Sequence, residues 1–239
     1  MARVLVVGAT GGIGGALARR LAVRGAEPFL VARDVARLQA LAGELGCGSA
    51  VADATDAAAL RAAVAAAGAE LAGITYCVGS ILLKPAARLA EADFLDAYRL
   101  NVVGAAMAVQ AALPALVAGK GSVVLFSSVA ARRGFPNHAA IGAAKAAVEG
   151  LAVSLAAELA PHVRVNVIAP SLTRTRIAEP LTRSPQMAEA IAKQHPIPRL
   201  GEADDAAALA DFLLSDAAGW ITGQVIGVDG GRGAIAGKG

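Results

Sequence analysis

Short runs of apolar residues alternate along the chain with longer, alanine-rich segments. Each run has the length of a β-strand, and most of its positions are apolar without a regular polar alternation, which is typical of a strand buried on both faces of a sheet. The predicted strands span residues 3–7, 28–32, 49–52, 74–78, 122–126 and 163–169, with a last strand in the sequence WITGQVIGVDGG. A first predicted helix follows the glycine-rich segment and ends near residue 24, and another begins near residue 137. The remaining predicted helices span about 35–45, 57–67, 91–116, 185–193 and 203–214.

This alternation predicts an α/β fold, a Rossmann-type doubly wound parallel β-sheet flanked by helices. The 239 residues suit a single domain with a sizeable core and contain no internal repeat or linker. Residues 176–200 interrupt the pattern with a polar, proline-bearing segment. A loop of this kind beside a ligand site commonly forms a lid, and its larger apolar side chains could line a pocket or cover the core. Those side chains are Ile177, Leu181, Met187 and Ile191.

The composition narrows the range of partners. The 56% hydrophobic fraction reflects alanine, and no uninterrupted apolar run approaches the ~18 residues that a membrane span needs. A net charge of +3, with scattered Lys and Arg, does not indicate nucleic acid and would suit an anionic cofactor. Cys47 and Cys77 lack metal-ligand or redox spacing, and the first residues lack a signal-peptide layout. We therefore expect a cytoplasmic protein without a metal or membrane partner.

A glycine-rich turn separates the first predicted strand from the first predicted helix. Gly8, Gly12 and Gly14 form the pattern G-x-x-x-G-x-G, with Thr10 and Ile13 in the same turn. Residues without a Cβ allow a pyrophosphate to approach the amide groups at a helix N-terminus. The position after a strand and before a helix favours dinucleotide binding over a merely flexible loop.

The end of the second predicted strand carries the signal for the type of dinucleotide. An acidic residue here would bind the adenosine ribose and favour NAD(H), but the chain has Ala32 followed by Arg33. A guanidinium can bind a 2′-phosphate through two parallel hydrogen bonds. The sequence therefore predicts NADP(H) in preference to NAD(H). The alternative is that Arg33 is a surface residue paired with Asp34.

A second chemical signal lies in the stretch FSSVAARRGFPNHAAIGAAKAAVEGL, residues 126–151. Pro136 and Asn137 predict a helix start, with Asn137 as the cap and His138 in the first turn. The spacing i, i+3, i+7 then places His138, Ile141 and Lys145 on one helix face. A Lys on an apolar face is costly to bury without a partner, so Lys145 either serves a site or extends its ammonium to solvent. His138 either acts chemically or packs at the loop–helix junction.

These motifs resemble those of the short-chain dehydrogenases/reductases. In that family a Ser follows the strand, a Tyr comes thirteen residues later, and a Lys four residues after that. Ser128 and Lys145 match, whereas the Tyr position holds Ile141, which cannot donate a proton. Asn101, in LNVVGA, matches the family Asn whose backbone carbonyl holds a water beside the Lys. The resemblance thus implies catalytic roles for Asn101, Ser128 and Lys145 without the usual acid.

The segment PNHAAIGAAKAAVE is similar to the corresponding segment of bacterial enoyl-acyl-carrier-protein reductases, a divergent branch of the same family. That branch places its Tyr seven residues before the Lys, after Pro-Asn. His138 occupies this position, and histidine is a competent general acid. The resemblance therefore implies that His138 replaces the Tyr. It would act as a proton donor or, in its neutral form, as an N–H donor to a developing oxyanion.

The remaining cofactor contacts also follow from the resemblance. It implies that Asp53 accepts from the adenine amino group, although Asp53 or Asp56 could instead cap the next helix. Gly79 ends the motif Tyr76-Cys77-Val78-Gly79, where most members have Asn-Asn-Ala-Gly. A Pro-Gly-x-x-x-Thr motif that contacts the nicotinamide amide and pyrophosphate corresponds to Pro170, Ser171, Thr173 and Thr175, with Ser171 in place of the Gly. The chain's C-terminal sequence is similar to a family subunit interface, which implies a homo-oligomer, a tetramer or a dimer.

Together these patterns predict an NADP(H)-dependent oxidoreductase that acts on a small molecule. Reduction of a carbonyl would need an acid at oxygen, and reduction of an activated C=C, such as that of an enoyl thioester, would need a stabilised enolate-like oxygen. The Pro-Asn-His sequence favours C=C reduction, whereas the glycine motif and Asn101 favour carbonyl reduction. A protein that binds NADP(H) without catalysis, as a sensor or scaffold, is the alternative from a different functional class.

Overall fold

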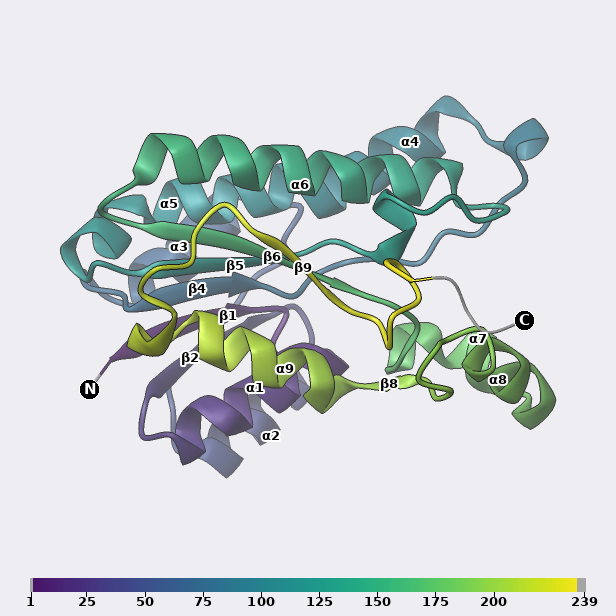
Figure 1. Cartoon of the computed structure of the whole chain (residues 1–239). Coiled ribbons are helices and arrows are strands. Elements are labelled where there is room, and N and C mark those ends of the chain that lie inside the picture. Colours follow the sequence, from purple (N-terminus) through teal and green to yellow (C-terminus); the bar gives the residue numbers. More distant parts are fainter. Residues whose placement is uncertain (1, 236–239) are drawn as a thin grey trace.

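The centre of the molecule is a parallel sheet of seven strands in the order β3-β2-β1-β4-β5-β6-β9 (Figure 1). The computed structural model describes residues 2–235. The order reverses between β1 and β4, so the fold is doubly wound, as predicted. The strands are β1 (Arg3–Val7), β2 (Glu27–Ala32), β3 (Ser49–Val51), β4 (Gly73–Tyr76), β5 (Ser122–Phe126), β6 (Arg164–Pro170) and β9 (Val225–Val228).

Helices cover both faces of the sheet and bury two apolar clusters against it (Figure 1). Alternate residues of one strand serve the two clusters: Leu5 packs with α3, α5 and α6, whereas Val4 and Val6 pack with α1, α2 and α9. This is why the strands contain no polar face. The helices are α1 (Gly12–Val23), α2 (Val35–Leu45), α3 (Ala57–Ala66), α4 (Glu91–Tyr98), α5 (Gly104–Ala118), α6 (Ala139–Leu159), α7 (Glu179–Thr182), α8 (Pro185–Ala192) and α9 (Ala203–Leu213).

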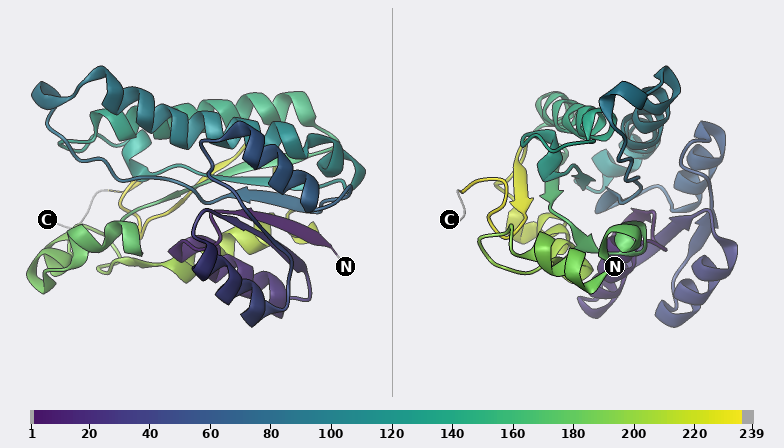
Figure 2. Two further views of the ribbon diagram at one scale, coloured as in Figure 1. Left: turned by 180° about the vertical axis from the view of Figure 1, so that it is seen from behind. Right: turned by 90° about the vertical axis from the view of Figure 1, so that its right-hand side faces the viewer.

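The loops that follow the strands gather at one end of the molecule, where α7 and α8 also lie (Figure 2). Residues 176–200, predicted to be irregular with one short helix, contain a 3₁₀ turn as well as α7 and α8. A small two-stranded sheet of β7 (Thr173–Arg174) and β8 (Gly201–Glu202) closes the base of this segment. The segment is therefore anchored at both ends beside the carboxyl edge of the main sheet.

The helix predicted for residues 91–116 contains an irregular turn. One π-helical turn, Arg99–Val103, joins α4 to α5. Asn101 lies in this turn and its side-chain Nδ2 donates to the carbonyl of Ala97 at 2.9 Å. Asn commonly bonds to nearby backbone in this way, and π turns are frequent at functional sites.

The start of α6 differs by one residue from the prediction. Asn137 is not the cap: its φ is +66°, in the left-handed region that Asn tolerates better than most residues. His138 is the N-cap residue, its carbonyl accepts from Gly142 at 2.7 Å, and the helix begins at Ala139. His138 therefore lies at the junction of loop and helix and not in the first turn.

Two helical stretches are long and apolar enough to cross a membrane by length and composition. They are Glu91–Ala118 and Ala139–Leu159, and in their most apolar windows 50% and 44% of the residues are buried inside the protein. Both pack against the sheet, where an apolar composition serves the core. We interpret them as core helices.

Candidate active site

A cavity of about 460 Å³ opens at the carboxyl edge of the sheet, and residues that follow β1 to β6 line it. It lies at the reversal of strand order, where open α/β sheets bind ligands. Most of the residues singled out in the sequence meet there: Gly8, Thr10, Gly12, Ile13, Arg33, Asp53, Gly79, Ser128, His138, Lys145, Pro170, Ser171, Thr173 and Thr175 line the cavity. Gly14 and Asn101 are not among the lining residues.

The glycine turn brings backbone close to the cavity. Gly8 has a φ of +87°, and a Cβ there would lie 2.9 Å from the backbone of Cys77. A Cβ at Gly12 would lie 2.7 Å from the side chain of Thr175, and one at Gly14 would lie 2.4 Å from the carbonyl oxygen of Gly8. Gly14 therefore closes the turn and does not line the cavity. The N-cap residue of α1, Gly11, has no side chain to satisfy the first amide groups of the helix.

Two charged side chains, Arg33 and Asp53, line the cavity where β2 and β3 end. Arg33 is 81% exposed in its side chain, and its guanidinium lies 3.9 Å from the carboxylate of Asp53. It does not pair with Asp34, which caps α2 by accepting from the amide of Arg37 at 3.1 Å. Arg33 is thus free to turn towards a ligand phosphate.

Asp53 is held by its own loop and does not cap a helix. Its Oδ1 accepts from the hydroxyl and the amide of Thr55 at 2.7 and 2.8 Å, and these bonds keep the pKa of Asp53 below its usual range. Its Oδ2 makes only the long contact to Arg33. Asp56 is the cap of α3, since it accepts from the amides of Ala58 and Ala59.

Lys145 is enclosed and does not extend to solvent. The residue is 8% exposed, and its Nζ donates to the carbonyl of Phe126 at 3.0 Å. Burial lowers the pKa of Lys145 to about 8. A Cβ at Gly79 would lie 3.2 Å from this nitrogen and 3.2 Å from Oδ1 of Asn101. Because Gly79 has no side chain, the ammonium of Lys145 can lie in the cavity wall next to its backbone.

Asn101 packs against Gly79, which lines the cavity. Its Oδ1 is buried and has no hydrogen-bond partner among residues 2–235, and it faces the same glycine as Lys145. A buried, unpaired carbonyl oxygen is costly and suits a site that a further molecule completes.

The two serines after β5 have different roles. Ser127 is buried and donates to the carbonyl of Lys145 or the carboxylate of Glu149, at 3.0 and 2.9 Å, so it ties β5 to α6. Ser128 lines the cavity, and its Oγ accepts from the amide of Ala130 at 3.1 Å. This bond uses a lone pair and leaves the hydroxyl proton of Ser128 available.

His138 presents one defined nitrogen for chemistry. Its Nδ1 lies 2.7 Å from the carbonyl oxygen of Pro136, and because a carbonyl can only accept, Nδ1 carries a proton. In the neutral ring, Nε2 is then an acceptor. The expectation that a neutral His138 could donate an N–H to an oxyanion is therefore wrong for this geometry: only the imidazolium donates from Nε2. No side-chain capping bond is formed by His138.

Ile141 also lines the cavity and is 6% exposed. Its side chain contributes an apolar surface beside His138 and Lys145, and it has no group that could exchange a proton. Three of the apolar residues singled out in residues 176–200 line the cavity as well: Ile177, Leu181 and Ile191. Met187 is exposed and does not reach it.

Two polar residues were not found from the sequence: one contacts a residue of the cavity wall, and the other lines the cavity itself. His195 is 4% exposed, and its Nδ1 donates to the carbonyl of Ile191 at 2.9 Å. Its Nε2 then accepts from the hydroxyl of Ser171 at 2.8 Å. Arg232, in the loop after β9, lines the cavity near His138. Neither residue has a short-range sequence relationship to its partner, so no local pattern could reveal it.

The bond between Ser171 and His195 predicts a measurable coupling. Loss of Ser171 leaves the buried Nε2 of His195 unpaired, and loss of His195 leaves the partly buried hydroxyl of Ser171 without this partner. A buried polar group left unpaired costs about 1–3 kcal/mol. We expect Ser171→Ala and His195→Phe to lower the free energy of unfolding in a non-additive way, with a coupling of about 1 kcal/mol in a double-mutant cycle. Urea unfolding of the four proteins measures it. Strict additivity would show that the bond does not tie the 176–200 segment to β6.

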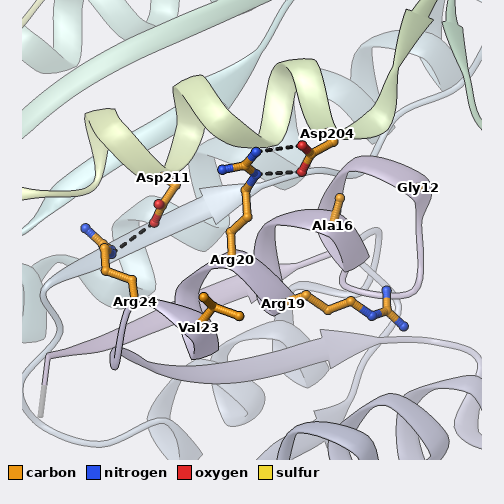
Figure 3. A pocket seen from close by; sticks show the side chains of 8 residues that line it. All are labelled: Gly12, Ala16, Arg19, Arg20, Val23, Arg24, Asp204 and Asp211. Carbon is orange, nitrogen blue, oxygen red and sulfur yellow. Dashed lines mark hydrogen bonds and ion pairs between the residues drawn. The ribbon is translucent and has the colours of Figure 1, made fainter.

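A second hollow of about 590 Å³ lies between α1 and α9 (Figure 3). Two of its arginines bridge the helices: Arg20 is bonded to Asp204 at 2.5 Å, and Arg24 is paired with Asp211 at 3.0 Å. A third, Arg19, is bonded to Glu44 at 2.6 Å. Each guanidinium is already neutralised by a carboxylate. We therefore interpret this hollow as a helix–helix contact.

The fold and the cavity define a class of protein: a doubly wound dinucleotide-binding domain with a buried Lys at the ligand crevice. A family model described as Enoyl-(Acyl carrier protein) reductase matches residues 8–232. The chain is 34% identical to 2-(S)-hydroxypropyl-CoM dehydrogenase 3 of Xanthobacter autotrophicus over 97% of this chain and 96% of the relative. The chain belongs to the short-chain dehydrogenase/reductase family.

Solved structures agree with this assignment. A short-chain type dehydrogenase/reductase from Mycobacterium ulcerans is 35% identical, with a TM-score of 0.93 over 99% of this chain and 91% of that one. A gluconate 5-dehydrogenase from Burkholderia cenocepacia, in complex with NADP and tartrate, is 27% identical with a TM-score of 0.92, over 98% of this chain and 96% of that one. The fold is thus shared over nearly the whole length of the chain.

Proposed function

We propose that the protein is an NADP(H)-dependent oxidoreductase that reduces the carbonyl group of a small molecule, with His138 as the proton donor. One observation carries the proposal: the Nδ1 proton of His138 is held by Pro136, while the ring lines the same cavity as Ser128 and the buried Lys145. This arrangement supplies a cation, a hydroxyl and a proton-exchanging nitrogen, which are the groups that ketone reduction requires.

The cavity fits a nicotinamide dinucleotide at several points. Gly8 and Gly12 leave backbone where a side chain would collide, and the first turn of α1 offers amide groups to a pyrophosphate. The free Oδ2 of Asp53 suits the adenine amino group. Pro170, Thr173 and Thr175 would border the nicotinamide end. When bound, the reduced cofactor supplies a hydride.

Residues of the chain would then donate a proton to the substrate oxygen and stabilise the negative charge that develops on it. Lys145 holds the ribose hydroxyls and places positive charge beside the reacting centre. Ser128 donates a hydrogen bond from its free hydroxyl to the substrate oxygen and keeps its proton. The imidazolium of His138 passes its Nε2 proton to that oxygen, while Pro136 holds Nδ1–H in place. In the reverse reaction the neutral ring accepts the proton at Nε2.

Reduction of an activated C=C is the second candidate. The family model described as Enoyl-(Acyl carrier protein) reductase supports it, as does the position of His138 seven residues before Lys145. In that reaction the same imidazolium stabilises an enolate-like oxygen. The dehydrogenase named among the relatives supports the first candidate.

The experiment that tests the proposal follows NADPH absorbance with a mixed panel of ketones, aldehydes and enoyl thioesters. We expect at least one class to be reduced by the wild-type protein, and the responding class identifies the bond. NADPH binding without turnover of any class would overturn the proposal and favour a protein that binds NADP(H) as a sensor or scaffold.

Arg33 supports the choice of NADP(H). The side chain is exposed at the end of β2 and has no partner closer than 3.9 Å in the described chain. A charge-assisted bond to the 2′-phosphate contributes about 1.5–3 kcal/mol. We therefore expect Arg33→Ala to weaken NADPH binding by about 10–100-fold and to leave NADH binding unchanged.

Titration of protein fluorescence with each cofactor measures this change. Arg37→Ala is the matched control, since it removes a neighbouring cation that is paired with Asp34. Equal weakening of NADPH and NADH in Arg33→Ala would contradict the assignment of Arg33 to the 2′-phosphate.

We further propose that residues 176–200 act as a substrate lid and that the protein is a cytoplasmic homo-oligomer, a dimer or tetramer. The lid is supported by the cavity contacts of Ile177, Leu181 and Ile191. The oligomer is supported by apolar side chains exposed on the surface, among them Leu95 on α4 and Trp220. Side chains of this kind are often covered by another subunit.

A further inference from the structure

Arg232 is a cation in the cavity wall that has no carboxylate partner among residues 2–235. Its guanidinium donates to the neutral side-chain oxygen of Gln194, and its backbone carbonyl accepts from Arg133. Burial, and then the charge of Arg133, lower the pKa of Arg232. The arginines of the α1–α9 hollow, in contrast, each bond to a carboxylate. A half-buried guanidinium beside a second cation is a site that an anion would stabilise.

Aromatic contacts connect this cation to the proposed proton donor. The Cζ of Arg232 lies 4.7 Å from the ring centroid of Phe135, which lies 5.4 Å from the ring centroid of His138. The guanidinium and the imidazole therefore contact the same phenyl ring. Because Arg stacked on an aromatic ring loses few further conformations on binding, its planar donor set is ready for a ligand.

The charges of the cavity differ between its two ends. Among the residues that line it, the one acid is Asp53, at the adenosine end. Arg232 lies near His138, since both contact Phe135. The lining also contains Arg176 from residues 176–200 and many apolar side chains. These include Ile81, Leu83, Ile177, Leu181 and Ile191. A ligand with an apolar body and one negative group is complementary to these residues.

We propose that the substrate carries an oxyanion group, a carboxylate in the first place, and that Arg232 binds it. This inference rests on the proposed function and names the substrate class for the same site. A carboxylate accepts two parallel hydrogen bonds from a guanidinium, which would fix the orientation of the carbonyl group towards Ser128 and His138.

The test compares oxo acids of increasing chain length with their methyl esters as substrates. We expect the wild-type protein to prefer the acids by at least about 10-fold in kcat/KM, which is the effect of one charge-assisted contact. Arg232→Gln should lose this preference through a higher KM for the acids, while its activity on the esters and its affinity for NADPH stay close to wild type. Arg174→Gln is the matched control, because Arg174 is an exposed arginine outside the cavity.

The opposite results are equally clear. Equal activity of the wild-type protein on acids and esters, or an unchanged preference in Arg232→Gln, would overturn the inference and leave the proposed function intact. Weakened NADPH binding in Arg232→Gln would also overturn it, since Arg232 would then hold the cofactor.

A binding measurement separates the inference from the proposed function. Calorimetry with the NADPH-bound protein measures the affinity for benzoate, benzenesulfonate and phenyl phosphate, and needs no turnover. We expect benzoate to bind the wild-type protein at least about 10-fold more tightly than Arg232→Gln. If no substrate is reduced but this difference is found, the anion site stands and the proposed function fails. Tighter binding of the sulfonate or the phosphate would identify that group as the oxyanion, and no binding of the three would overturn the site.

Discussion

Replacing His138 with alanine lowers kcat for the responding substrate by about 10²–10⁴-fold and leaves the affinity for NADPH unchanged. The size follows from the contribution of a positioned general acid, because Ile141 cannot supply a proton and Ser128 is a poor acid at neutral pH. The cofactor affinity is preserved because no contact of His138 contributes to the glycine turn or to Lys145. Steady-state kinetics with NADPH, together with a fluorescence titration of the cofactor, measure both quantities.

The chain offers a matched control for this experiment. His162 is an exposed histidine at the far end of α6, outside the cavity, and His162→Ala should retain wild-type kcat. His138→Gln is a second variant that keeps a hydrogen-bonding side chain but cannot become a cation. Substantial turnover in both His138 variants would show that a different group passes the proton.

Replacing Lys145 with methionine raises the free energy of unfolding at pH 7 by about 2 kcal/mol, although it lowers kcat/KM by about 10²-fold or more. Burial lowers the pKa of Lys145 from 10.5 to about 8 in the folded protein. A shift of this size corresponds to a cost of roughly 3 kcal/mol for the buried ammonium, at 1.36 kcal/mol per pKa unit. Loss of the bond from Nζ to the carbonyl of Phe126 offsets about 1 kcal/mol of the gain.

The difference in the free energy of unfolding between Lys145→Met and the wild-type protein depends on pH in a defined direction. Below pH 8, Lys145 is charged in the folded and the unfolded protein, so the folded wild-type protein bears the whole cost. Between about pH 8 and 10.5 the unfolded chain binds a proton that the folded protein has lost, and the contribution of Lys145 to stability rises with pH. Urea unfolding at pH 7 and pH 9.5 should therefore show the advantage of Lys145→Met shrinking. A variant less stable than wild type at pH 7 would contradict this account of Lys145.

Most of the fold could be predicted because it depends on local patterns. Val4, Leu5 and Val6 form a continuous apolar run since alternate side chains enter different clusters, and this gives a buried parallel strand its sequence signature. Gly8 and Gly12 stand out for a similar reason: the turn tolerates no Cβ there, so glycine marks it in the sequence. Ser128, His138 and Lys145 could be predicted to meet because Ser128 directly follows the strand residues 122–126, and His138 and Lys145 are seven residues apart at the N-cap and in the interior of one helix.

Other features depend on contacts that spacing does not encode. The left-handed conformation of Asn137 moves the start of α6 by one residue, since Asn serves in loops as readily as at helix caps. The protonated nitrogen of His138 is set by the carbonyl of Pro136, a matter of local geometry. Arg232 reaches the cavity, and His195 reaches Ser171 in the cavity wall, from segments far away in the chain. Only the folded structure joins Arg232 to Phe135 and His195 to Ser171.

The central claim is that His138 passes the proton, and the pH dependence of the reaction in both directions tests it most directly. With saturating cofactor, reduction should slow and oxidation should speed up as the pH rises, because the imidazolium form of His138 donates the proton and the neutral form accepts it. Loss of charge on Lys145 near pH 8 slows both directions and cannot produce opposite trends. We expect the opposite trends in the wild-type protein and their absence in His138→Gln. Unchanged opposite trends in that variant would contradict the claim.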